Sequence, residues 1–85
     1  MFKTDRTFIK GLLTESSKET VSSLIKYFDL PILLERTLTE LYVEGLCIKE
    51  IAYKYNVDER TIKRYHTKAL DLAEANVKAR IKMSL

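Results

Sequence analysis

The sequence predicts an all-α fold, and three observations support this prediction. Apolar residues recur every three or four positions along most of the chain, which is the period of an amphipathic helix. Only two glycines and one proline occur among the 85 residues, so the chain has few helix breakers. The apolar share of 46% suffices for one small hydrophobic core. We therefore expect a single domain over residues 1–85.

Two N-terminal helices are expected in residues 1–30. The second of them should begin at Ser16, because Ser16 and Glu19 have the spacing of a capping box. It should end near Asp29, since Pro31 disfavours helical backbone in the residue before it. The side chains of these two helices that should point into the core are Phe8, Ile9, Leu12, Leu13, Val21, Leu24, Ile25 and Phe28.

Residues 31–72 are expected to form a core of three helices. Pro31 suits the start of the first helix, where a missing N–H costs little, and Gly45 suits its end. The second helix should stop at Asn56, because Asn adopts the left-handed conformation more readily than most residues. Val57 then provides an apolar plug between the second and third helices. The apolar face of the second helix is expected to consist of Ile48, Ile51, Ala52 and Tyr55.

The third helix should begin at about Glu59, because Asp58 can accept hydrogen bonds from the first free N–H groups. No stop signal follows, so residues 73–85 should extend it. We expect its apolar stripe to pack on the N-terminal helices or on a second copy of the chain in a homodimer, since so long an exposed stripe is unusual on a monomer. The far part of this stripe consists of Leu70, Ala73, Val77 and Ile81. Near the helix start, Ile62, Tyr65, Ala69 and Leu72 fall on the packed side, and Arg60, Lys63, Arg64, Thr67 and Lys68 fall on the other.

Two short helices separated by a tight turn, with cations near the start of the second, are the layout of a helix-turn-helix that reads DNA. The net charge of +3 is concentrated there. Residues 1–46 carry six basic and seven acidic side chains, residues 47–70 carry six and three, and residues 71–85 carry three and two. Lys and Arg release counterions when they neutralise phosphates, so this placement favours nucleic acid as the partner. We therefore expect a tri-helical helix-turn-helix core, with N-terminal helices and a long C-terminal helix, that binds double-stranded DNA.

A family resemblance is carried by residues 43–52, Val-Glu-Gly-Leu-Cys-Ile-Lys-Glu-Ile-Ala, and by residues 57–63, Val-Asp-Glu-Arg-Thr-Ile-Lys. This pattern resembles the LuxR-type domain and the region 4 domain of sigma-70 factors, and small phage and mobile-element transcriptional regulators look similar. The resemblance covers about residues 33–72. It implies a sequence-specific regulator of transcription whose recognition helix, about residues 59–70, lies in the major groove. The similarity to sigma region 4 adds RNA polymerase as a further candidate partner.

The resemblance and the residue types together predict the DNA contacts. Glu59 and Arg60 match base-contacting positions of sigma region 4. Lys63, Arg64 and Thr67 match those of the LuxR group. Arg64 is common to both alignments, and Arg favours guanine through a two-pronged hydrogen bond. The residues expected to touch phosphate, which orients a domain without reading sequence, are Cys47, Lys49, Tyr53, Lys54, Thr61 and Lys68.

Other interpretations stay open at several positions. The charged surface can be an ordinary solvated helix face, or the chain can be a protein-interaction module that keeps the helix-turn-helix shape. Such a module would act as an RNA polymerase adapter or as an inhibitor of a host complex. Cys47 replaces the Ser that usually caps this helix in the family, and it is either a small capping residue or a redox switch. His66 is either structural or phosphate-facing.

The sequence predicts neither an enzyme nor a metal protein. No nucleophile, base and orienting group can be assembled, and no glycine-rich phosphate loop is present. One His and one Cys do not supply the three or four ligands of a metal site. No apolar run approaches the roughly 20 residues that cross a bilayer, and a single cysteine suits a reducing compartment. We therefore expect a cytoplasmic protein without catalytic residues, metal or cofactor.

Overall fold

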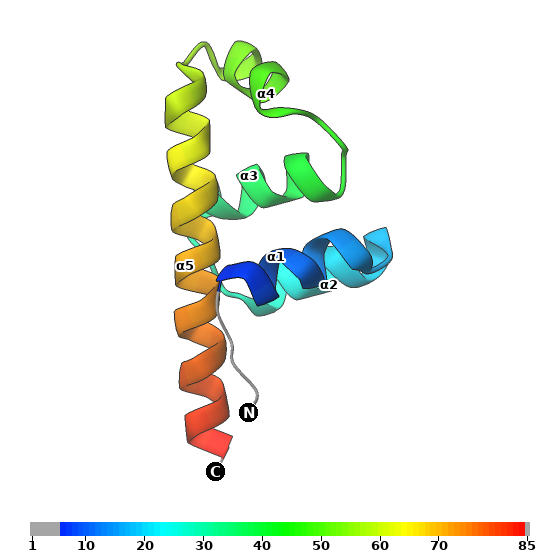
Figure 1. The fold of residues 1–85 in the computed structure, drawn as a ribbon, viewed down its shortest axis with the longest axis vertical. Helices are drawn as coiled ribbons and strands as arrows, with labels where there is room; N and C mark the ends of the chain where they lie inside the picture. Colours follow the sequence, from blue (N-terminus) through cyan, green and yellow to red (C-terminus); the bar gives the residue numbers. More distant parts are fainter. Residues whose placement is uncertain (1–5, 85) are drawn as a thin grey trace.

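The computed structural model describes residues 6–84, which form five helices and no strands (Figure 1). The all-α prediction is thus confirmed for this range, and residues 1–5 of the predicted N-terminal unit, together with Leu85, lie outside it. The helices are α1 (Arg6–Glu15), α2 (Lys18–Tyr27), α3 (Ile32–Tyr42), α4 (Ile48–Tyr55) and α5 (Glu59–Ser84).

Helix α5 runs along the whole length of the domain, and the other helices lie beside it (Figure 1). Its 26 residues span about 39 Å at the usual helical rise, close to the 44 Å long axis of the molecule. Helices α1, α3 and α4 pack directly on α5, while α2 packs on α1 and α3. The other four helices are therefore organised around α5.

Two hydrophobic clusters meet along α5. The larger cluster joins α1, α2 and α3 to the middle of α5, where Ala69 and Ala73 present small side chains that allow close approach. The smaller cluster joins Ile51 and Ala52 of α4 to Ile62 near the start of α5. Tyr65 packs against both clusters, so they form one continuous core. The buried members of the larger cluster are Ile9, Leu13, Val21, Ile25, Phe28, Leu34, Leu38, Ala69, Leu70 and Ala73.

The predicted connections around α4 are confirmed. Gly45, which follows α3, has φ +75°, and Asn56, which ends α4, has φ 54° and ψ 48° in the left-handed region. The Arg60 N–H donates to Asp58 Oδ1 at 3.0 Å, as expected for a residue that caps α5. The turn between α4 and α5 therefore consists of residues 56–58, and its short length fixes how the two helices cross.

The start of α2 differs from the prediction by one residue. Ser17, not Ser16, is the N-cap, and its Oγ accepts a hydrogen bond from the Thr20 N–H at 3.3 Å. The predicted pairing of Ser16 with Glu19 is therefore wrong. Serine is a favourable N-cap residue at either position. Ser17 is the N-cap because its backbone is extended just before the helix begins. Pro31 likewise precedes α3 as its N-cap instead of occupying the first helical position.

Two side chains at the end of α4 are more exposed than predicted. Val57 is 40% exposed, so it is not a plug between α4 and α5. Tyr55 was placed on the buried face of α4, but its ring remains partly exposed because its hydroxyl reaches towards α3. Both residues instead border a shallow groove between α3 and the start of α5.

The apolar stripe of α5 is covered mainly by the chain's own helices. Leu70 and Ala73 are buried in the larger cluster, and Val77 packs against its edge. Of the two predicted ways to cover this stripe, packing on the N-terminal helices therefore applies to Leu70 and Ala73, and neither is free to meet a second copy. Ile81 lies beyond these helices and is 44% exposed.

The core predicts a sharp contrast between two leucines of α3. Leu38 is fully buried, so Leu38→Ala should lower the free energy of unfolding by about 2 to 5 kcal/mol. Leu33 is 55% exposed, so Leu33→Ala should lower it by less than about 1 kcal/mol. Urea denaturation followed by circular dichroism measures both values. Equal losses for the two variants would contradict this packing.

Candidate nucleic-acid interface

The first three turns of α5 separate packing from exposure as the sequence predicted. Ile62 and Ala69 are buried against α4 and the larger cluster, which fixes the rotation of the helix about its axis. The predicted base-contacting residues all lie on the exposed surface, and Thr61 is partly buried. These exposed residues are Glu59, Arg60, Lys63, Arg64 and Thr67, followed by the predicted phosphate contact Lys68.

Three of the other predicted phosphate contacts lie on α4 or at its N-cap. Cys47, Lys49 and Tyr53 are exposed, and the exposed fraction of Tyr53 is 90%. The Cys47 N–H donates to Glu50 Oε1 at 3.0 Å, which closes a capping box. Hydrogen bonds from Cys47 hold the pKa of Glu50 below its ordinary value. Glu50 thus supports the weak cap that Cys47 provides.

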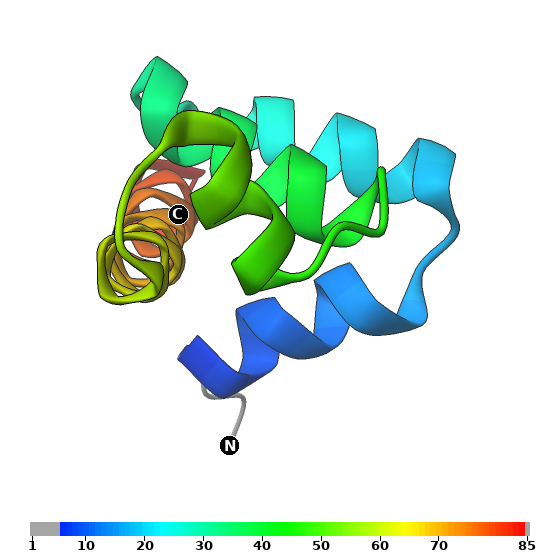
Figure 2. The ribbon, with the colours of Figure 1, turned by 90° about the horizontal axis from the view of Figure 1, so that it is seen from above.

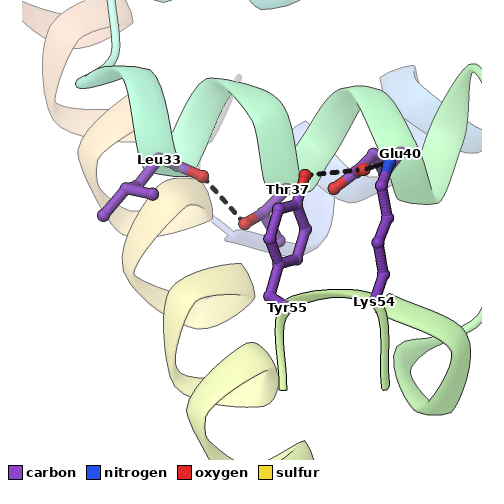
Figure 3. Close-up of polar contacts among 5 residues, drawn as sticks. All are labelled: Leu33, Thr37, Glu40, Lys54 and Tyr55. Carbon is purple, nitrogen blue, oxygen red and sulfur yellow. Dashed lines mark hydrogen bonds and ion pairs between the residues drawn. The ribbon is translucent and has the colours of Figure 1, made fainter. Parts of the chain in front are cut away.

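Lys54, the remaining predicted phosphate contact on α4, forms an ion pair with Glu40 of α3. Its Nζ donates to Glu40 Oε2 at 2.6 Å, and the same oxygen accepts a hydrogen bond from the Tyr55 hydroxyl at 2.8 Å (Figure 3). The hydrogen bond to Glu40 raises the pKa of Lys54. The ammonium is therefore directed at α3, and a phosphate would have to share it with this carboxylate.

Glu40 is the residue of this region that the sequence reasoning missed. Its side chain is 2% exposed, and Thr37, one turn earlier on α3, is also buried. Oε1 has no hydrogen-bond partner among the residues that the structure describes. A buried carboxylate costs free energy unless it is paired, so its bonds to Lys54 and Tyr55 tie α4 to α3. The sequence showed only that Glu40 lies one helical turn after Thr37, which does not reveal that its carboxylate is buried against α4.

His66 links α5 to α3. Its Nε2 lies 2.6 Å from the Tyr42 hydroxyl, and the ring is about half-buried. Burial lowers the pKa of His66 below 6.5, and the nearby positive charge of Lys10 lowers it further. Burial also raises the pKa of Tyr42. A neutral imidazole can accept the Tyr42 O–H, so of the two predicted roles of His66 this geometry supports the structural one.

Within the described residues 6–84, no three His, Cys, Asp or Glu side chains are grouped so that they could hold a metal ion. None of the helices in that range combines the length and the apolar character of a membrane span. Comparisons of the chain with protein-family models, with curated proteins and with solved structures found no match.

The Glu40 cluster predicts that two tyrosines of α4 respond differently to the same change. Tyr55→Phe removes a hydrogen bond to a buried carboxylate and should lower the free energy of unfolding by about 1 to 3 kcal/mol. Tyr53→Phe is the matched control, because the Tyr53 side chain is almost fully exposed, and it should change this free energy by no more than about 0.5 kcal/mol. The measurement is chemical denaturation of both variants. Indistinguishable values would show that the Glu40 cluster does not stabilise the domain.

The lowered pKa of His66 predicts that stability depends on pH. Below pH 6.5, His66 is protonated in the unfolded chain but remains neutral in the folded chain, because its pKa is lower there. The free energy of unfolding should therefore fall as the pH falls. The stabilisation due to neutral His66 is complete above pH 6.5. It is lost as the pH falls towards the pKa that His66 has in the folded chain. Thermal unfolding between about pH 7.5 and pH 5.5 measures this slope, and His66→Gln should flatten it. A slope that His66→Gln leaves unchanged would assign the effect to other groups.

Proposed function

We propose that the chain is a sequence-specific regulator of transcription that binds double-stranded DNA with residues 59–70 of α5 in the major groove. The observation that carries this proposal is the exposed cationic face of α5, opposite a side that is buried in both clusters. A helix fits the major groove, which is about 12 Å wide, and side chains near its start reach the base edges.

Within residues 6–84, the cationic side chains on this face are free of ion pairs that would compete with a ligand, and this supports the proposal. Among the residues that the structure describes, neither Lys63 nor Arg64 forms an ion pair or a side-chain hydrogen bond, so both are available to a ligand. Residues 47–70, which include this face, hold the positive excess of the chain. Arg64 is the strongest candidate for a base contact, because its guanidinium can grip guanine with two hydrogen bonds.

The beginning of α4 is suited to hold the DNA backbone. Lys49 is exposed there, and the positive end of the helix dipole favours a phosphate. Tyr53 is exposed in the last turn of the same helix. Contacts of this kind orient a domain without reading sequence. Lys54 would contribute less, since Glu40 already holds its charge.

A second candidate function is a protein-interaction module, such as an adapter of RNA polymerase or an inhibitor of a host complex. The observation that favours it is the groove between α3 and the turn that precedes α5. It has a volume of about 130 Å³, and its lining includes the exposed side chains of Leu33, Tyr55 and Val57. Exposed apolar surface of this kind can meet a protein partner. The resemblance to sigma region 4 makes RNA polymerase a candidate partner under either function.

We also propose that the chain forms a homodimer, through a smaller part of α5 than the sequence predicted. Leu70 and Ala73 are buried within the chain, so a second copy would have to meet the exposed end of α5 around Ile81. A palindromic DNA site would support a dimer and give its half-site spacing, whereas a single asymmetric site would favour a monomer.

The DNA proposal is tested by selecting bound sequences from random duplex DNA and titrating the selected duplex at several salt concentrations. Lys63→Ala and Arg64→Ala should each weaken binding by about 1 to 3 kcal/mol if the lost contact is to a base. Lys26→Ala is a control, because Lys26 is exposed on α2, outside the surfaces of α4 and α5 that we assign to DNA. Absence of salt-dependent binding by the wild type, or unchanged binding by both α5 variants, would refute DNA binding by this face.

A further inference from the structure

Helix α1 contributes polar side chains beside the exposed face of α5. The beginning of α1 lies against the middle of α5 (Figure 1), and in the view along α5 it lies on the opposite side of the molecule from α2 (Figure 2). An open groove of about 390 Å³ follows the α1–α5 contact. It is lined by Thr7 and Lys10 of α1 and by His66, Thr67 and Leu70 of α5.

The chemistry of this groove suits an anion. Lys10 is exposed and forms no ion pair with any residue that the structure describes. Thr7 and Thr67 are exposed residues, and a threonine hydroxyl can donate a hydrogen bond to an anion. Among the residues that the structure describes, no carboxylate lines this groove. Lys10 lines this groove together with His66 and Thr67, which places Lys10 beside α5.

The groove adjoins the surface to which we assign base contacts. Thr67 belongs to both, since it lines the groove and lies one helical turn after Lys63 and Arg64 on the exposed face of α5. When a helix lies in the major groove, the phosphates of the two strands flank it, so a cation beside the helix is well placed to meet one of them.

We infer that Lys10 and Thr7, which lie beside Thr67, bind a backbone phosphate of the DNA, so that α1 extends the DNA interface beyond α4 and α5. This inference rests on the proposed DNA binding. The site takes a phosphodiester, and it contributes affinity without sequence preference, because it meets only the backbone. One such contact accounts for about one unit of the slope of log affinity against log salt.

The test compares Lys10→Ala with Lys10→Arg and with Lys18→Ala by titrating a fluorescent 20-base-pair duplex at several salt concentrations. Lys10→Ala should bind about five- to tenfold more weakly near 0.1 M salt and lower the salt slope by about one. Lys10→Arg should retain most of the affinity. Lys18 is exposed at the start of α2, whereas α2 contacts α5 at its other end, through Tyr27 and Arg80, so Lys18→Ala should bind like the wild type. The loss in Lys10→Ala should be the same for duplexes of different sequence.

The outcomes separate this inference from the function on which it rests. If the wild type binds DNA and Lys63→Ala weakens it, but Lys10→Ala keeps both affinity and salt slope, the phosphate site on α1 is refuted and DNA binding stands. An equal loss in Lys18→Ala would also refute the site, since it would show an effect of total charge. If the wild type does not bind the duplex, both proposals fail. Thermal unfolding of each variant verifies that the fold is intact.

Discussion

The domain depends on the burial of one side of α5. Ile62 packs on α4, and Ala69, Leu70 and Ala73 are buried in the larger cluster with residues of α1, α2 and α3, so a single helix joins both hydrophobic clusters. Burial of this side fixes the rotation of α5 about its own axis, because rotating the helix would expose this apolar surface. The side chains on the opposite side of α5 are therefore held towards solvent. The exposed cationic face near the start of α5 is therefore a consequence of core packing, and its orientation is set before any ligand binds.

Polar contacts of α3 complete this arrangement. Tyr42 meets His66 of α5, and Glu40 meets Lys54 and Tyr55 of α4, so α3 is tied to both helices of the proposed DNA interface. Hydrogen bonds have directional geometry, which hydrophobic contacts lack, and they specify how the helices are placed after the core has brought them together. The relative positions of α4 and α5 decide whether a phosphate and a base edge can be reached at once.

Periodicity and local backbone preferences made most of the helices predictable. The turn at Asn56, the cap at Asp58 and the long final helix follow from rules that act within a few residues of the chain. The sequence also predicted which side of α5 is exposed, because that separation depends on spacing alone. The cap of α2 was wrong by one residue, since Ser16 and Ser17 are equivalent in type and only the local backbone distinguishes them. The role of Glu40 and the groove formed by Lys10 could not be predicted, because both depend on helices that are distant in sequence and meet only in the folded chain.

The central claim is that the exposed face of α5 is the surface that meets DNA, and mapping by nuclear magnetic resonance tests it most directly. Backbone amide signals of the labelled protein would be followed during titration with a duplex selected for binding. The account predicts that the largest shifts occur at Lys63, Arg64 and Thr67, with further shifts at the start of α4. Shifts confined to the groove around Leu33 and Val57, or no shifts at all, would contradict it.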